Sequence, residues 1–229
     1  MAAGIRNTSE INTDAIAKLS LSKEENGLIS RALREPQGLN ENQWKKLVNL
    51  LTRKGLASTK SCRLTAKVCN AIVQAEMQCP KEDKYFRKNL LTRLQVDFKT
   101  HTAQNYEQQE HWINFVSFLC AIFDLLRVNN MPLMALTNPV ADSLCSLTME
   151  KFASSEHAMQ CLVTQLQFIG EELDRLNKTK MEELFEKLKQ LFLFDDITQL
   201  SRLLLLEIIE LRCGGWKLSP AAYSYYYES

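Results

Sequence analysis

Apolar residues recur along this chain at intervals of three and four positions, the spacing that places them on one face of an α-helix. Leu28, Ile29, Ala32 and Leu33 form the first such stripe, and the segment that carries them ends before Pro36. The pattern then predicts helices over residues 40–54, 61–77, 83–106, 110–126, 140–152, 155–176, 181–192 and 197–212. Most of the chain is therefore expected to be helical.

Helix-capping signals support the first two of these segments. Ser22 is followed three residues later by Glu25, and Asn40 by Gln43, so both pairs fit a capping box in which each side chain bonds the other residue's backbone N–H. Gly55 and the pair Gly214 and Gly215 follow apolar stripes and suit helix C-termini. The sequence thus predicts where several helices begin and end.

Two helices have unusual apolar patterns. Residues 110–126 are apolar almost all round, which indicates a central, buried helix. In residues 197–212 the stripe is expected to hold Leu200, Leu203, Leu204, Ile208 and Leu211, and Glu207 interrupts it. That carboxylate either pairs with a basic side chain of an adjacent helix, which we favour, or faces a groove.

The spacing of these segments predicts the fold class. Nine or ten helices joined by short connections pack as consecutive antiparallel hairpins, and pairs of them recur at intervals of roughly 40 residues. We therefore predict an all-α fold of about five HEAT-like antiparallel helical hairpins stacked into an alpha-alpha superhelix, in preference to a globular bundle. Residues 1–21 lack periodicity and are predicted to be a flexible N-terminal lead-in, and residues 22–229 a single HEAT-like helical-repeat domain.

Composition and charge narrow the function classes. The net charge of +1 argues against a domain whose main function is to bind phosphate backbones, but it is compatible with a local basic patch. No apolar run approaches the roughly 20 residues that span a bilayer, so no membrane partner is expected. Seven cysteines, an odd number, favour free thiols in a reduced cytosolic or nuclear compartment.

The sequence offers no catalytic, metal or cofactor site. None of the cysteines forms a C-x-x-C pair, and His101, His111 and His157 lie at no ligand spacing from them. Gly214 and Gly215 follow a helix, whereas a phosphate-binding loop follows a strand and opens a helix. Neighbouring carboxylates such as those at positions 171–172 fit solvated helix surfaces. We therefore expect that the protein is not an enzyme and binds no cofactor.

Two segments are candidate protein-binding sites. The connection over residues 127–139 contains two prolines and mixes polar and apolar side chains; Arg127, Asn130, Met131 and Met134 are the proposed contacts, with burial beneath neighbouring helices as the alternative. The tyrosine-rich end contributes Tyr225 and Tyr226, since tyrosine is enriched at interfaces, with docking against the last helix pair as a slightly favoured alternative.

Several stretches of this sequence resemble one protein family. They are Arg-Val-Asn-Asn-Met-Pro-Leu-Met-Ala-Leu at 127–136, Asn-Pro-Val at 138–140, Leu-Leu-Leu-Leu-Glu-Ile-Ile-Glu at 203–210, Gly-Trp-Lys at 215–217, Pro-Ala-Ala at 220–222 and Tyr-Tyr-Tyr at 225–227. From about Ser22 onward, the chain is similar to the small proteins built almost entirely from a domain like the middle domain of eukaryotic translation initiation factor 4G. These are known as interactors of the histone stem-loop-binding protein.

The resemblance implies a function as well as a HEAT-type fold. It implies a non-catalytic adaptor that bridges the histone mRNA stem-loop-binding protein to the initiation scaffold, factor 4G, and so promotes translation of non-polyadenylated histone mRNAs by circularising them. It also implies a homodimer, and residence in cytoplasm and nucleus is expected. The alternative is a direct RNA-binding or RNA-helicase-binding translation regulator, because the large scaffold uses this domain for both; those contact residues are not matched to positions here.

Overall fold

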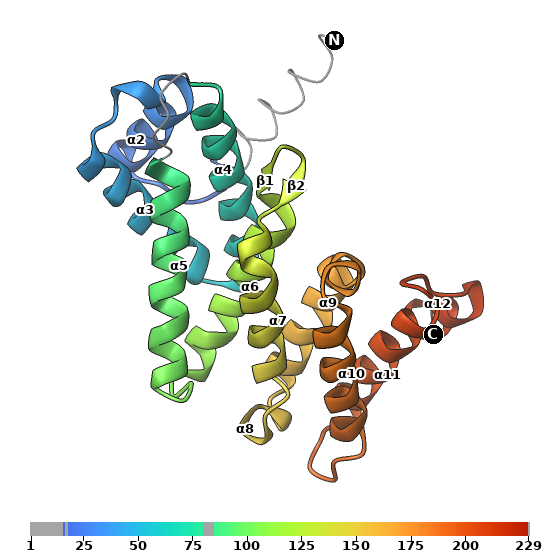
Figure 1. The fold of residues 1–229 in the computed structure, drawn as a ribbon. Coiled ribbons are helices and arrows are strands. Elements are labelled where there is room, and N and C mark those ends of the chain that lie inside the picture. Colours follow the sequence, from blue (N-terminus) through green and yellow to red (C-terminus); the bar gives the residue numbers. More distant parts are fainter. Residues whose placement is uncertain (1–15, 17, 80–84, 229) are drawn as a thin grey trace. The chain divides into compact units, whose positions relative to one another are not determined.

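The computed structural model describes residues 16, 18–79 and 85–228. The chain divides into two compact units, Met1–Leu133 and Met134–Ser229. Figure 1 shows that helices dominate both.

The described part of the first unit holds five α-helices and a short hairpin. The helices are α2 (Lys23–Arg34), α3 (Glu41–Leu56), α4 (Thr59–Met77), α5 (Tyr85–Ala103) and α6 (Gln109–Leu125), with a 3-10 turn, η1 (Pro36–Gly38), after α2. The two strands are β1 (Arg127–Val128) and β2 (Met131–Pro132). Helix α4 packs against α2, α3 and α6, and α3 packs against α5. Each helix therefore contacts a neighbour next but one along the chain, as stacked helical hairpins do.

Helix α6 is the central helix of this unit, as its apolar sequence predicts. Every residue from Phe115 to Phe123 is buried, and Trp112 stacks on Phe115 with ring centroids 5.3 Å apart. Trp44 on α3 packs against Phe86 on α5, with ring centroids 5.9 Å apart. The close packing of α3 against α6 requires a glycine at position 55. A Cβ on Gly55 would lie 2.5 Å from the ring of Phe118.

Both predicted capping boxes are present. The Ser22 side chain accepts from the Glu25 N–H while the Glu25 carboxylate accepts from the Ser22 N–H, and Asn40 and Gln43 do the same at the start of α3. Ser58 and Ser61 form a third box at α4. Each box satisfies backbone donors that have no partner within the helix, so the short turns between these helices are fixed by local sequence.

The second unit holds six α-helices within residues 134–228, which the structure describes. They are α7 (Thr137–Ser146), α8 (Glu150–Ala153), α9 (Glu156–Leu176), α10 (Lys178–Phe192), α11 (Gln199–Cys213) and α12 (Pro220–Tyr227), preceded by the 3-10 turn η2 (Met134–Leu136). Helix α9 packs against α7, α8, α10 and α11, and α10 also contacts α7 and α11. The predicted helix over 140–152 is two helices, because the chain turns at residues 147–149.

The apolar stripe predicted for residues 197–212 is right at Ile208 and wrong at Leu200 and Leu203. Leu205, Ile208 and Ser201 face the core of the unit, whereas Leu200 and Leu203 are exposed. The run Leu203–Leu206 places leucine on every side of a helix, so hydrophobic spacing alone cannot choose the buried side. Packing against α9 and α10 decides it.

The predicted fold class is confirmed: the chain is all-α and HEAT-like, with a single two-residue hairpin as its sheet in the described residues. The structure has two compact units, and the prediction of a single domain over residues 22–229 stays a prediction. The predicted lead-in over residues 1–21 lies mostly outside the described residues; within its described part, Leu19 is buried and Lys54 donates to the Ser20 carbonyl at 2.7 Å. No helix in the described ranges has the length and apolarity needed to span a bilayer.

All seven cysteines are free thiols. Cys62, Cys69, Cys120 and Cys161 are buried, and Cys213 is exposed. Burial raises the pKa of the Cys69 thiol far above its usual value, so this group packs as a small apolar side chain.

Candidate protein-interaction surfaces

The segment after α6 forms a β-hairpin that the sequence did not predict. Asn129 and Asn130 both have positive φ, 51° and 62°, and they make the two-residue turn between β1 and β2. Asparagine tolerates this left-handed region, and two such residues in succession give a turn whose twist suits a hairpin. The Asn-Asn pair between Arg127-Val128 and Met131-Pro132 was the signal available in the sequence.

Helix α4 holds the hairpin in place through its backbone. The Gln74 side chain donates to the carbonyl of Arg127 at 2.6 Å, and the Arg127 N–H donates to Asn70 Oδ1 at 3.3 Å. The Arg127 guanidinium lies 4.0 Å from Asp124, which also pairs with Arg63 at 2.7 Å. Arg127 is half-buried, and these contacts support the hairpin.

The structure brings together three of the four residues proposed in this connection. Arg127, Asn130 and Met131 lie on the hairpin; Asn130 is exposed at the turn and the Met131 side chain is 55% exposed. Met134 is also exposed, but it begins η2 and belongs to the second unit. In the first unit, the open part of the proposed site is the turn with Asn130 and Met131.

The tyrosine-rich end is a docked helix, α12. Ser219 caps it, and Pro220 occupies its first turn, where a missing N–H costs nothing. Tyr226 donates to Glu210 on α11 at 2.9 Å, and Tyr227 donates to Glu207. The favoured expectation of docking thus matches Tyr226, whereas Tyr225 points outward and is 61% exposed.

The partners of Glu207 differ from the expected basic side chain. This carboxylate is buried, and it accepts hydrogen bonds from the Gln167 amide at 2.6 Å and from the Tyr227 hydroxyl. Hydrogen bonding to the carboxylate, followed by burial, raises the pKa of Tyr227 to about 12. Burial and the bond to Glu210 raise the pKa of Tyr226 as well, so both phenols stay protonated donors at neutral pH.

Exposed apolar side chains form a patch on α11 and α12, which we call the α11–α12 patch. It consists of Leu200, Leu203, Leu206, Tyr223 and Tyr225. Leu203 and Leu206 precede Glu207 and Glu210 by four residues each, so they share a helix face with the two carboxylates that hold α12. Their exposed fractions are both 40%. An exposed apolar face of this kind makes the patch a candidate interaction surface.

A cluster around Trp216 fixes the end of α11. Arg212 forms two hydrogen bonds with Asp174 on α9, at 2.8 and 3.0 Å, and the Trp216 indole N–H donates to the same carboxylate at 3.1 Å. The hydrogen bonds from Arg212 lower the pKa of Asp174. The Arg212 guanidinium also lies 4.4 Å from the centre of the Phe185 ring. These contacts fix the C-terminal end of α11, which carries part of the α11–α12 patch, against α9.

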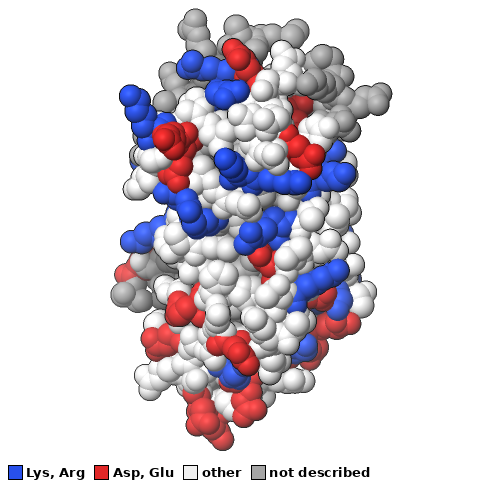
Figure 2. All heavy atoms as spheres, turned by 90° about the vertical axis from the view of Figure 1, so that its left-hand side faces the viewer, with Lys and Arg blue, Asp and Glu red and all other residues white. Residues whose placement is uncertain are grey.

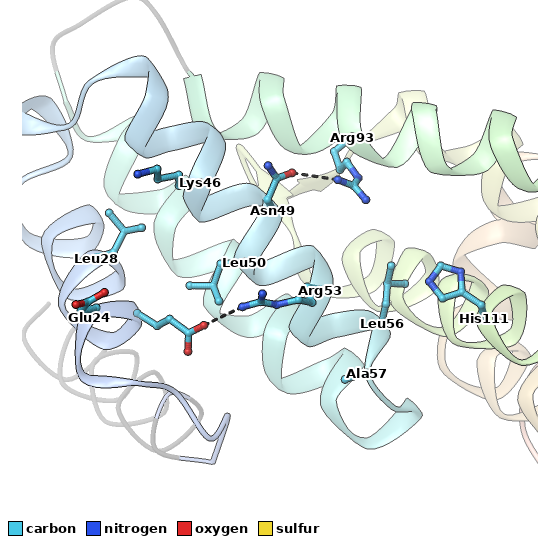
Figure 3. A pocket seen from close by; sticks show the side chains of 11 residues that line it. Glu24, Leu28, Lys46, Asn49, Leu50, Arg53, Leu56, Ala57, Arg93 and His111 are labelled. Carbon is cyan, nitrogen blue, oxygen red and sulfur yellow. Dashed lines mark hydrogen bonds and ion pairs between the residues drawn. The ribbon is translucent and has the colours of Figure 1, made fainter.

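The first unit contains an open groove of about 800 Å³ between α2, α3, α5 and α6. Figure 3 shows its arrangement: Leu28, Leu50 and Leu56 supply apolar surface, while Lys46 and Arg53 project from α3. Arg53 pairs with Glu25 on α2 at 2.9 Å. No sequence pattern signalled this groove, because its lining comes from four helices that are apolar on their other faces.

His111 lines one end of the groove and contacts His101. His111 Nδ1 is 2.9 Å from His101 Nε2, and His101 is buried against Trp112 and Phe115. The second nitrogen of His101, Nδ1, is buried and has no hydrogen-bond partner within the described part of the chain. Burial, and then the neighbouring His111, lower the pKa of His101, which Asp97 opposes. His101 is therefore held neutral.

This pair predicts loss of stability in acid. The pKa of His101 is lower in the folded state than the unfolded value of about 6.5, so the unfolded chain binds more protons as pH falls through that value. We expect the free energy of unfolding, measured in urea at pH 7.5, 6.5 and 5.5, to fall with pH. The fall should be smaller in His101→Gln, which cannot titrate. Equal pH dependence in both proteins would show that His101 does not carry the effect.

The two units have opposite net charge. Residues 1–133 contain 19 lysines and arginines against 13 aspartates and glutamates, a net +6, whereas residues 134–229 contain 9 against 14, a net −5. Figure 2 shows lysine and arginine side chains, with aspartates and glutamates among them, on the face that carries α2, α3 and α5. The overall charge of +1 is therefore the sum of a basic unit and an acidic unit. A local basic surface on the first unit is consistent with these charges.

The described residues contain no group of three or more histidine, cysteine, aspartate or glutamate side chains placed to hold a metal ion. The surfaces above are instead suited to contacts with macromolecules, through exposed apolar side chains bordered by polar ones.

Comparison with known proteins finds close relatives over nearly the whole chain. The MIF4G domain family matches residues 10–213, so α12 lies beyond the matched region. MIF4G domain-containing protein B of Danio rerio is 40% identical over 209 residues, 91% of this chain and 92% of the relative. The MIF4G domain-containing proteins of Mus musculus and Homo sapiens are 38% identical over 220 residues and 39% identical over 209 residues. These alignments cover 96% and 91% of this chain, and 97% and 92% of the two relatives.

Proposed function

Because this chain belongs to the MIF4G domain family, whose domains mediate protein or RNA interactions in translation, we propose that it is a non-catalytic adaptor in the translation of histone mRNAs. It bridges the histone stem-loop-binding protein at the 3′ end of a non-polyadenylated message to the initiation scaffold, factor 4G, at the 5′ end. The resulting loop promotes initiation. The observation that carries the proposal is the match of relatives of similar length along almost the entire chain.

An adaptor needs separate surfaces for its partners, and exposed apolar residues in both units support this. Met131 is open at the hairpin turn of the first unit. The second unit presents the α11–α12 patch. We assign the hairpin turn to a partner protein, with Asn130 supplying polar contacts beside the apolar anchor. Cytoplasm and nucleus are the proposed compartments, where histone messages are made and translated.

We assign the α11–α12 patch to self-association, so that the working form of the protein is a homodimer. A two-fold dimer buries the same patch of both copies, and aromatic and leucine side chains on one rigid helix pair suit such a self-complementary contact. The hydrogen bonds of Tyr226 and Tyr227 hold α12 in place without using the outward faces of Tyr223 and Tyr225.

Direct binding of RNA, or of an RNA helicase, is the second candidate function. The observation that favours it is the net charge of +6 over residues 1–133, since basic domains attract phosphate backbones and acidic partners. RNA affinity that falls steeply between about 50 and 200 mM salt would support this candidate, because phosphate contacts release counterions.

A pull-down separates the two candidates. Immobilised protein is expected to recover the stem-loop-binding protein from cell extract even after RNase treatment, because the contact is between proteins. Met131→Asp should reduce the recovered partner at least fivefold, by placing a charge on the apolar anchor of the turn.

Met149→Asp is the matched control, since Met149 is an exposed methionine at the start of α8, outside both surfaces. Loss of the partner with the RNA would contradict the adaptor proposal. Equal recovery with Met131→Asp and the unaltered protein would place the partner site elsewhere.

A further inference from the structure

We propose that the groove of the first unit binds a short segment of a partner protein in which apolar side chains are flanked by carboxylates. The proposal rests on the adaptor function and names the chemistry of one partner. It concerns α2, α3 and α5, a surface separate from the hairpin turn and from the α11–α12 patch.

The size and floor of the groove fit a peptide segment. Its volume of about 800 Å³ lies within the range of known ligand sites, roughly 300–1,000 Å³. Leu28 and Leu56 are half-buried and Leu50 is buried, so the floor is aliphatic but partly open to water. An open groove between helices accepts the apolar face of an amphipathic segment. Covering these leucines supplies the binding energy.

The cations of the groove lie on one side. Lys46 is exposed, and within the described residues no ion pair is formed by it. The Arg53 side chain is 72% exposed, and its pair with Glu25 uses Nη2 alone. Arg93 on α5 binds Asp97 through Nε and Asn49 through Nη1. Lys46 and Arg53 on α3 can therefore form ion pairs with a carboxylate of a bound segment.

The acidic side chains lie across the groove, on α2. Glu24 is exposed and Glu25 is engaged with Arg53. This opposition fixes the orientation of the bound segment, with its carboxylates toward Lys46 and its uncharged side toward α2. The net charge of +6 over residues 1–133 adds a longer-range attraction that speeds the encounter with an acidic partner.

The lining argues for a peptide over single-stranded RNA. Surfaces that bind single strands combine basic residues with aromatic side chains on which bases stack. Among the described residues that line this groove, His111 at one end is the single aromatic side chain, and Glu24 would repel phosphates. An aliphatic floor with a cationic edge matches leucine and glutamate better than bases and phosphates.

Fluorescence anisotropy on the full chain tests the proposal. Three labelled probes are titrated at about 50 mM salt, where electrostatic contacts are strong: a 16-residue helical peptide of leucine and glutamate, the same peptide with lysine for glutamate, and a 16-nucleotide oligouridine. The leucine–glutamate peptide should bind. Lys46→Glu should weaken that binding about tenfold, which corresponds to about 1.4 kcal/mol.

Lys60→Glu is the matched control, because Lys60 is exposed in the first turn of α4, outside the groove, and its reversal changes the unit's charge equally. It should weaken binding less than twofold. Equal effects of both variants, equal affinity for the lysine peptide, or no peptide binding would overturn the proposal. Binding of oligouridine alone, lost in Lys46→Glu, would make the groove a nucleic-acid surface instead.

The outcome for the groove is separable from the outcome for the adaptor. If the RNase-resistant pull-down succeeds but the peptide probe does not bind, the adaptor stands and the groove assignment is wrong. If the probe binds with the expected response to Lys46→Glu while the pull-down fails, the groove stands and the histone-message partner is wrong.

Discussion

Replacing Gly170 by alanine should lower the free energy of unfolding by about 2 kcal/mol, the middle of the range for overfilling a packed site. A Cβ at this position on α9 would lie 2.1 and 2.2 Å from two ring atoms of Trp216. The ring cannot retreat freely, because its N–H donates to Asp174 and it packs at right angles to the Phe185 ring, with centroids 6.0 Å apart. Urea unfolding followed by circular dichroism measures the loss.

Gly27→Ala is the matched control for this prediction. Gly27 also lies inside a helix, α2, but a Cβ there would meet nothing within 4 Å. Alanine at such a site should raise the stability by roughly 0.5–1 kcal/mol, because glycine costs a helix conformational entropy. The two substitutions thus have opposite expected signs. A stabilising Gly170→Ala would mean that Trp216 does not pack on α9.

The double variant Leu203→Glu with Leu206→Glu should weaken self-association about 100-fold or more. Fully burying a leucine is worth roughly 1.5–3 kcal/mol, so covering the exposed 40% of four leucines, two from each copy, is worth roughly 2.4–4.8 kcal/mol. About 2.8 kcal/mol corresponds to a factor of 100 in the dissociation constant. Glutamates on both copies would also repel one another. Sedimentation velocity at micromolar concentration should show a dimer for the unaltered protein and a monomer for the variant.

Val96→Glu controls for a charge placed on an exposed apolar residue, since Val96 is exposed on α5 in the other unit. Circular dichroism should be unchanged in all three proteins, because none of the substituted side chains is buried. A dimer that survives the double substitution would place the self-association surface elsewhere, and a monomeric unaltered protein would remove the dimer from the proposed function.

Local chemistry made much of the fold predictable. The boxes at Ser22 and Asn40 are complete within four residues of sequence, so they form wherever the chain folds. The central position of α6 was predictable because a helix that is apolar on every side must be covered. Gly214 and Gly215 likewise follow α11 where the apolar stripe ends.

The features that failed prediction depend on distant partners. Glu207 is held by Gln167, 40 residues earlier, and by Tyr227, 20 residues later, so its environment is invisible in its own segment. The hairpin at 127–132 needs Asn70 and Gln74 of α4 to bind its backbone. The same reason applies to the candidate sites: exposure of Met131 was open at the sequence level, and the groove arises where four helices meet.

The opposite charges of the two units have a practical consequence for handling the protein. Chromatography on ion exchangers senses local patches rather than the sum, so at low ionic strength near pH 7.5 the chain should be retained by both cation and anion resins despite its net charge of +1. In concentrated, salt-poor solution the basic residues of one molecule attract the acidic residues of another. Moderate salt should therefore dissolve this protein better than water.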